Sequence, residues 1–303
     1  MVKKKRDLRS LIKEHSFLFK AGLFGTALFL TYSAVRNLKI NENMLKLFLI
    51  PAILNIILVI LQAFDSNIVS FIPVSGVGGF LGNRGLTACF LAITTPLFIK
   101  YCKLGLPFLF LALLLCQTFT AILACVCVVM FYFWYSKRKQ LEWWLVACGL
   151  ILALVGLFHK NNNMFGFEVR HKTYMETINM IGRNPILGWG VGSYLPIMTD
   201  VALKNMEPEQ DNKISSIRRG VMHHPHNEML LGWFSFGILF PIVVLIYAVD
   251  IVRRFNRDKI VPFTIMIAGV ICSMGYFLSP PAWFLMMFGL GVYDNKEVKH
   301  GTV

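Results

Sequence analysis

The chain has 303 residues, of which 56% are apolar and only 15% charged, with a mean hydropathy of +0.62. Soluble domains carry about a quarter charged residues, so this composition excludes an ordinary soluble globular protein. A net charge of +14 would suggest a nucleic-acid partner, but many of the Lys and Arg residues lie in short clusters beside apolar runs. Such clusters are typical of topology signals. We therefore expect an all-α, polytopic membrane protein whose surroundings are the lipid bilayer, with no nucleic-acid partner.

Several apolar windows are long enough to cross a membrane, which takes about 20 residues as a helix. In chain order they are Phe17–Val35, Met44–Phe64, Leu141–Phe158, Met229–Val249 and Ile260–Leu278. Leu86–Ile99 and Gly105–Tyr135 are also apolar, and Ala282–Val292 predicts a last, short helix. Together they predict about eight or nine transmembrane helices in a single membrane domain over residues 1–303.

The stretch Gly105–Tyr135 decides the parity of the topology. Its 31 residues are too many for one crossing and few for two, since one helix of this length would span about 46 Å. Two helices meeting near Gln117–Thr120 would keep Lys100, Lys103 and the basic cluster at 136–139 on the inner side. One tilted helix would instead bring the basic N-terminus inside. We predict two helices.

The distribution of Lys and Arg in the short loops predicts the orientation, because inner loops carry the excess. The clusters Ser136–Lys139 and Arg253–Lys259 belong inside. This places residues 64–84 and 159–227 outside, the latter as one long extracytoplasmic loop. Loops of this length without a role are uncommon, so we expect function there.

The first half of the long loop predicts an amphipathic helix. Tyr174, Ile178 and Ile181 follow helical spacing within Val169–Ile181. Asn184-Pro185 should end this helix. The run Gly188–Gly192 then predicts a flexible turn, with Trp189 at the depth of the lipid head groups.

The second half of the long loop ends in a polar motif that directly precedes an apolar window. Histidines within His223–Glu228 can exchange protons near neutral pH, and Arg218 with Arg219 can clamp a diphosphate. The alternative is a simple helix start, with Asn227 as N-cap and Glu228 favoured by the helix dipole. The histidines lack the spacing and the second ligand cluster of a metal site, so we predict neither metal nor cofactor.

The other outward loop ends in the glycine-rich run Ser75–Gly85. Its glycines let backbone N–H groups approach an anion, and Arg84 adds a positive charge at a helix N-terminus. A flexible turn into the next span is the alternative interpretation.

These loops, in this order, resemble those of the O-antigen ligase/polymerase family of bacterial membrane glycan transferases. The resemblance covers roughly residues 25–292. It depends on Gly82-Asn83-Arg84 before a span, on Arg170 followed by Tyr174, on Asn184–Gly192, and on His224–Glu228 opening the next span.

The resemblance implies transfer of a glycan from a polyprenyl diphosphate carrier to an acceptor hydroxyl at the outer face of the bacterial inner membrane. It implies His226 as the base that takes the acceptor proton and Arg170 as the residue that binds the donor diphosphate. The implied partners are the lipid-linked donor and a glycolipid, glycan or protein acceptor, and ligase and polymerase activity both stay open. Further candidates for substrate binding are Arg84, Asn83, His224, Asn227, Glu228, Arg218 and Arg219.

One position departs from the family pattern. The family usually has a Ser-Arg pair between two short helices, where this chain reads Cys116–Thr120 with Phe119 at the arginine position. Arg84, Arg218 or Arg219 could replace that charge in space; without such a replacement we expect weak, altered or lost activity. An inactive, shortened paralogue that serves as a structural partner is one alternative. A transporter or flippase-like protein for an anionic or lipid-linked substrate is a further alternative, although the predicted spans hold few ionisable residues.

Overall fold

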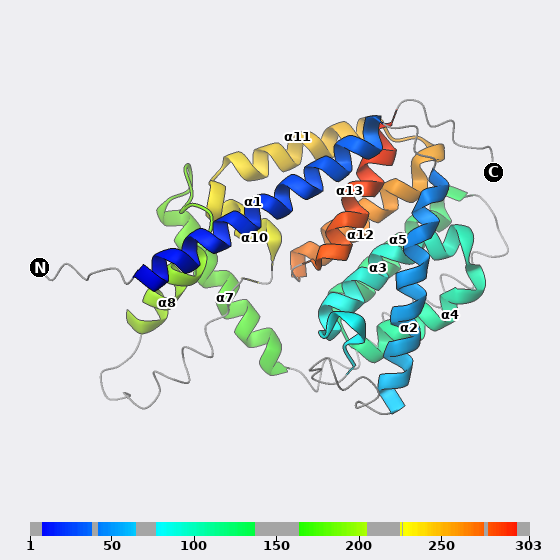
Figure 1. Ribbon diagram of the computed structural model, residues 1–303, viewed down its shortest axis with the longest axis horizontal. Coiled ribbons are helices and arrows are strands. Elements are labelled where there is room, and N and C mark those ends of the chain that lie inside the picture. Colours follow the sequence, from blue (N-terminus) through cyan, green and yellow to red (C-terminus); the bar gives the residue numbers. More distant parts are fainter. Residues whose placement is uncertain are drawn as a thin grey trace, which may run out of the picture. The chain divides into compact units, whose positions relative to one another are not determined.

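The computed structural model describes residues 8–37, 42–64, 77–136, 164–204, 225, 227–275 and 278–295. Within these ranges every regular element is a helix, as predicted for a helical membrane protein. The chain forms two compact units (Figure 1). Unit 1 comprises Met1–Ala27 and Gly166–Asp250, and unit 2 comprises Leu28–Phe165 and Ile251–Val303.

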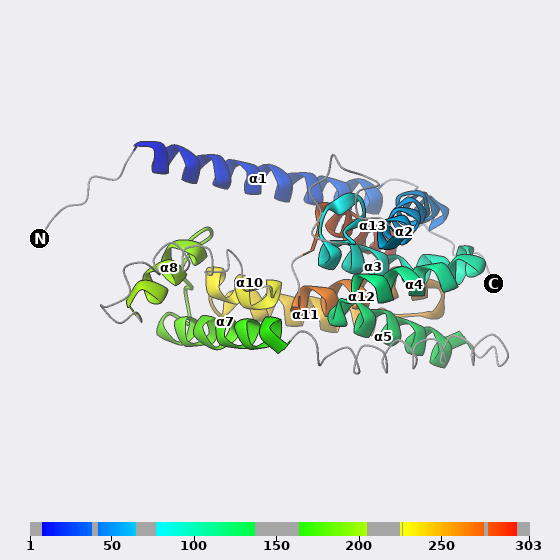
Figure 2. The ribbon, with the colours of Figure 1, turned by 90° about the horizontal axis from the view of Figure 1, so that it is seen from below.

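Unit 2 contains most of the helices. They are the end of α1 (Leu8–Asn37), η1 (Glu42–Phe48), α2 (Leu49–Phe64), η2 (Gly79–Leu81), α3 (Arg84–Tyr101), η3 (Lys103–Gly105), α4 (Leu106–Cys116), α5 (Phe119–Ser136), η6 (Arg257–Lys259), α12 (Ile260–Gly275) and α13 (Pro280–Asp294). Helix α3 lies at the centre, because every residue from Thr87 to Ile99 is buried. Helices α2, α4, α5, α12 and α13 surround it (Figures 1 and 2). The core is almost purely apolar.

Two predictions about helix breaks in unit 2 are confirmed. The long stretch Gly105–Tyr135 forms two helices, α4 and α5, which separate at Gln117 and Thr118. Gln117 has a left-handed backbone with φ of 51°, a conformation that ends a helix. The predicted last helix is α13, which begins with Pro280 in the first turn, where the missing N–H costs nothing.

The predicted apolar windows agree with the observed helices to different degrees. One described helix, Met44–Phe64, is long and apolar enough to cross a membrane, and the shorter apolar helices are Lys103–Cys116, Phe119–Tyr132 and Ile260–Met274. The predicted span Met229–Val249 is wrong as a continuous helix, because the chain breaks between α10 (Glu228–Phe236) and α11 (Leu239–Arg253). The window Leu141–Phe158 lies outside the described residues.

Unit 1 has a small core of its own. Besides α10 and most of α11 it contains α7 (Met164–Arg183) and α8 (Tyr194–Lys204). The fully buried members of the core are Met180, Ile181, Tyr194, Met198 and Phe234. Helix α7 ends where Asn184-Pro185 predicts, but Ile178 does not belong to its buried face, since it is 48% exposed. The segment after α7 folds back onto Met180 and Ile181 instead.

Candidate functional site

The glycine-rich loop before α3 is a fixed turn. The side-chain Oε1 of Gln62 accepts hydrogen bonds from the N–H groups of Gly78 and Gly79, at 3.0 and 2.9 Å. Asn55 Oδ1 accepts one from Phe80 N at 3.0 Å. Thr87 Oγ1 donates to the carbonyl of Gly78 at 2.5 Å. Three side chains from α2 and α3 therefore hold this loop, which disfavours the interpretation as a flexible turn.

Asn55 and Gln62 were missed as functional residues by the sequence analysis. They are seven positions apart, so they lie on the same face of α2, and both are buried in an otherwise apolar helix. A polar side chain inside a membrane helix costs free energy unless it is paired. Two such amides at this spacing are the signal that predicts a loop packed against this face.

Arg84 occupies the first position of α3, and its side chain is exposed. The preceding residue, Asn83, is the N-cap, and its Oδ1 accepts hydrogen bonds from Gly85 N and Leu86 N at 2.9 and 3.3 Å. A cation at a helix N-terminus is repelled by the helix dipole, whereas an anion there is stabilised. The placement therefore costs stability unless an anion binds beside it.

The break between α4 and α5 lies within electrostatic range of Arg84. Arg84 lies near enough to Cys116, the last residue of α4, for its charge to act on that thiol. Phe119, the first residue of α5, is 55% exposed. Thr118 between them is buried and donates from Oγ1 to the Cys116 carbonyl at 3.2 Å. Arg84 is thus near the segment in which the O-antigen ligase/polymerase family carries its arginine.

In unit 1, the segment after α7 is bound to α10 through its backbone. Trp189 N donates to the carbonyl of Phe234 at 2.8 Å, and Gly190 N donates to that of Ser235 at 3.0 Å. The indole Nε1 of Trp189 donates to the Met180 carbonyl at 2.8 Å. The predicted turn is present, with positive φ at Gly188, Gly190 and Gly192. Within it, Trp189 joins the end of α7 to the end of α10.

Two glycines make this backbone contact possible. Gly188 and Gly237 have φ of 69° and 62°, a conformation that other residues rarely adopt. A Cβ atom at Gly188 would lie 2.7 Å from the Ser235 carbonyl oxygen, and one at Gly237 would collide with the carbonyl of Ile186. The break that divides the predicted span Met229–Val249 is a consequence of this close approach.

Tyr194 closes the core of unit 1 beneath the junction. Its hydroxyl lies 3.0 Å from Thr177 Oγ1, and its ring packs edge-on against Phe234, with centroids 5.1 Å apart. Burial is the main cause that raises the pKa of Tyr194 to about 12. At neutral pH this hydroxyl therefore stays protonated and serves the hydrogen bond.

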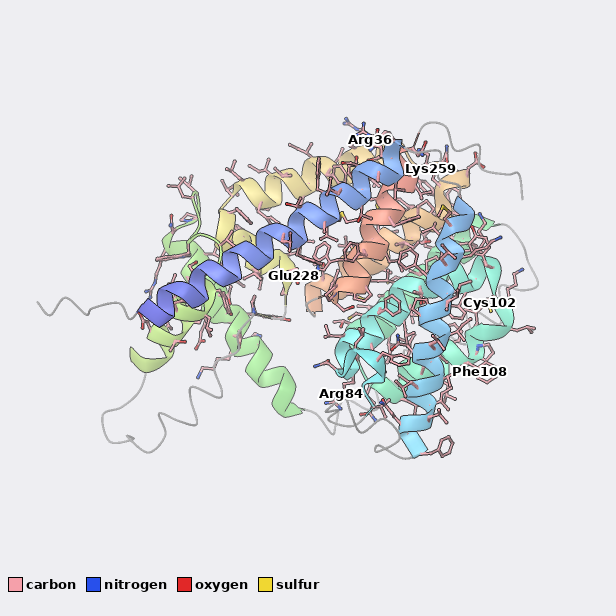
Figure 3. All side chains as sticks on the ribbon, viewed as in Figure 1. Arg36, Arg84, Cys102, Phe108, Glu228 and Lys259 are labelled. Carbon is pink, nitrogen blue, oxygen red and sulfur yellow. The ribbon has the colours of Figure 1, made fainter. Side chains whose placement is uncertain are left out.

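Asn227 and Glu228 form the start of α10. Asn227 Oδ1 accepts a hydrogen bond from Leu230 N at 3.0 Å, and Glu228 lies in the first turn (Figure 3). The local interpretation of these residues as a helix start is confirmed. Their role in substrate binding stays a prediction.

The other candidate residues have the following places. Arg170 lies on α7 in unit 1. His226, His224, Arg218 and Arg219 lie outside the described residues. Asn83 and Arg84 are neighbours in unit 2, and Asn227 and Glu228 are neighbours in unit 1. Among the described candidates, these are the two pairs that the structure brings together. Among the described side chains, no group of three His, Cys, Asp or Glu residues could hold a metal ion.

Comparison with protein-family models gives a match to part of the chain. Residues 104–240 match the family model described as O-antigen ligase. The match supports the O-antigen ligase family. It covers every motif that suggested this family except Asn83-Arg84, and it extends from η3 to the second residue of α11. No curated protein and no solved structure matches the chain.

Proposed function

We propose that the protein transfers or polymerises a glycan, taking it from a polyprenyl diphosphate carrier and joining it to an acceptor hydroxyl at the outer face of the inner membrane. The observation that carries this proposal is the O-antigen ligase match over residues 104–240. That segment contains both predicted catalytic residues, Arg170 and His226.

The proposed reaction divides its work between two residues. His226 takes the proton from the acceptor hydroxyl, whose oxygen then bonds to the anomeric carbon of the donor sugar. The bond between that carbon and the phosphate oxygen breaks, and the polyprenyl diphosphate leaves with the electron pair. Arg170 stabilises the negative charge on the departing diphosphate. The reaction needs no further redox or nucleotide partner, because the diphosphate is the leaving group.

Arg84 fits the proposal as a second cation for the diphosphate. It is exposed at the start of α3 and lies near Cys116, the last residue of α4 before the break where Phe119 stands at the arginine position of the family. The N-terminus of α3 adds a partial positive charge at the same place. Arg84→Gln should lower transfer by tenfold or more by losing roughly 1.5–3 kcal/mol of a charged hydrogen bond. Lys103→Gln, at an exposed position on the α3–α4 turn, is the matched control.

The catalytic assignment is tested with purified protein, a polyprenyl-diphosphate glycan and a panel of acceptors. Wild type should form glycosylated acceptor, and His226→Ala and Arg170→Ala should reduce the rate by about 10² or more. His171→Ala and Arg183→Ala, both on α7, are the controls for loss of a histidine and an arginine. Equal transfer by wild type and the two catalytic variants would reject the assignment.

A second function is supported by Phe119 alone. An aromatic residue at the arginine position leaves the chain one cation short, as in an inactive paralogue that serves as a partner of an active enzyme. Absence of transfer by wild type with every acceptor, and recovery of transfer in Phe119→Arg, would favour this function. Movement of the lipid-linked donor across vesicles without any transfer would favour a transporter.

A further inference from the structure

Among the described residues, one end of unit 2 places three cations near the carboxylate of Asp294. Arg254 Nη1 forms a salt bridge with Asp294 Oδ1 at 2.6 Å. Tyr32 donates from its hydroxyl to the other oxygen, Asp294 Oδ2, at 2.7 Å. Arg36 in turn donates to the Tyr32 hydroxyl at 3.3 Å. Both oxygens of Asp294 are therefore occupied, and one of them by a neutral group.

Lys259 joins the same cluster through Tyr293. Its Nζ donates to the Tyr293 carbonyl at 2.6 Å and lies 4.7 Å from the centre of the Tyr293 ring. Arg254 lies 5.7 Å from the same ring. The hydrogen bonds and ring contacts of Arg36 and Lys259 are with the neutral groups of Tyr32 and Tyr293. Within the described cluster, Arg36, Arg254 and Lys259 outnumber Asp294. Figure 3 shows Arg36 and Lys259 at this end of unit 2 and Arg84 at the other.

The electrostatics of Lys259 agree with an excess of positive charge. Burial and, after it, the neighbouring Arg254 lower the pKa of Lys259, while Asp294 acts in the opposite direction without compensating for them. A further anion beside this cluster would reduce the repulsion between the two cations.

An aromatic pocket adjoins the cations. It has a volume of about 380 Å³ and is lined by Phe131, Trp134, Tyr135, Val252, Phe255 and Phe263. Phe255 and Phe263 have ring centroids 4.3 Å apart, and Phe263 lies 6.4 Å from Tyr293, the ring that faces Arg254 and Lys259. Trp134 is 81% exposed at the rim. The apolar pocket and the cationic cluster thus share one continuous aromatic wall.

The chemistry of this surface selects its ligand. An apolar molecule would leave the three cations without a counter-charge, and a small soluble anion would leave the aromatic pocket unfilled. A zwitterionic lipid fills the pocket but brings no net charge to the cluster. Basic pockets between membrane helices on the inner side bind anionic head groups, and the sequence predicts Arg253–Lys259 on that side.

We propose that this end of unit 2 binds an anionic phospholipid, with the head-group phosphate at Arg36, Arg254 and Lys259 and the start of an acyl chain in the aromatic pocket. The site is separate from the proposed transfer reaction and does not depend on it. A bound lipid would hold the ends of α1, α5 and α13 together, because the cluster and the pocket take residues from all three.

The test uses purified full-length protein in nanodiscs that contain a small fraction of lipid brominated near the top of its acyl chains. Bromine quenches tryptophan at contact distance, and Trp134 lines the pocket. Brominated phosphatidylglycerol should quench at a lower lipid fraction than brominated phosphatidylcholine, and Trp134→Phe should remove this difference. Equal quenching by the two lipids in wild type would overturn the proposal, and this comparison needs no variant to fold.

Variants then locate the head group. Arg36→Gln and Lys259→Gln should each weaken the preference for phosphatidylglycerol about fivefold, as expected for the loss of one cation near an anionic surface. Lys103→Gln, an exposed cation outside the cluster, should leave it unchanged. Excess inorganic phosphate should not compete, since it lacks the acyl chain. Competition by phosphate, or equal effects of Lys103→Gln and Lys259→Gln, would contradict the assigned site.

Discussion

The two units fix their polar segments in different ways. In unit 2 the loop Gly78–Phe80 is held by side chains, chiefly the amides of Asn55 and Gln62, which project from a large apolar core. In unit 1 the segment after α7 is held by direct backbone hydrogen bonds to α10, over a core of five buried residues. A side chain that holds a loop by hydrogen bonds can be replaced by a similar side chain that forms the same bonds. Backbone contacts depend on the absence of a side chain, so unit 1 should respond more sharply to substitution at its glycines.

The largest expected effect is at Gly237. Gly237→Ala adds a Cβ that collides with the Ile186 carbonyl at a left-handed backbone position. We expect a loss of roughly 3 kcal/mol or more in stability, because steric overlap adds to backbone strain of about 1–3 kcal/mol. Thermal unfolding followed by limited proteolysis of residues 166–250 measures it.

Gly190→Ala separates strain from collision at the same junction. Gly190 has φ of 85°, but a Cβ there would meet nothing within 4 Å. This variant should lose only about 1 kcal/mol. Equal losses for Gly237→Ala and Gly190→Ala would show that the close backbone approach does not matter.

Gln62 provides the matching test in unit 2. Gln62→Leu removes the acceptor of two buried N–H groups and should cost roughly 2–4 kcal/mol, since each unpaired buried donor costs about 1–3 kcal/mol. Gln62→Glu keeps an acceptor oxygen and should preserve more of the stability at about pH 4, where its carboxyl is protonated, than at neutral pH, because a buried carboxylate is costly. Glycan transfer should fall with Gln62→Leu as well, because the loop positions Arg84. If both variants unfold at the temperature of wild type, the amide does not hold the loop.

The indole of Trp189 should have a smaller effect. Trp189→Phe keeps an aromatic ring against Phe234 but loses the hydrogen bond to the Met180 carbonyl. We expect a loss of about 1 kcal/mol, measured by chemical denaturation. No change would mean that the backbone bonds of residues 189 and 190 suffice to join α7 to α10.

The smallest effect appears only at high pH. Because burial raises the pKa of Tyr194 to about 12, the folded state holds this proton more tightly than the unfolded chain, where tyrosine ionises near about 10. Its contribution to stability should be complete below about pH 10 and should vanish as the pH rises to about 12. Thermal scans across this range, with Tyr194→Phe as a control that lacks the dependence, test the sign.

The sequence predicts some of these features because their causes are local. The break between α4 and α5 follows from a mainly apolar stretch of 31 residues, which is long for one crossing, and from the polar residues Gln117, Thr118 and Thr120 within it. The end of α7 follows from Pro185, and the start of α10 from Asn227. Each of these signals lies within a few residues of its effect.

The missed features have causes far away in the chain. Gly237 interrupts an apolar window because Gly188, 49 residues earlier, must approach its backbone. Gln62 lies in an apolar helix because its partners follow 16 and 17 residues later. Helix α8 was not predicted. It packs through Tyr194 and Met198 into the core of unit 1, and these contacts are with residues far away in the sequence. Periodicity within one window holds no information on such contacts.

The central proposal is that this chain transfers glycans from a diphosphate carrier although Phe119 stands where the O-antigen ligase family, which it resembles, has an arginine. The most direct measurement is the rate of transfer from a polyprenyl-diphosphate glycan by wild type, Arg84→Gln, and the double variant Arg84→Gln/Phe119→Arg. We predict transfer by wild type, a loss of tenfold or more in Arg84→Gln, and recovery in the double variant, because either arginine places a cation at the α4–α5 break. Full activity of Arg84→Gln, or no transfer by any of the three, would contradict the account.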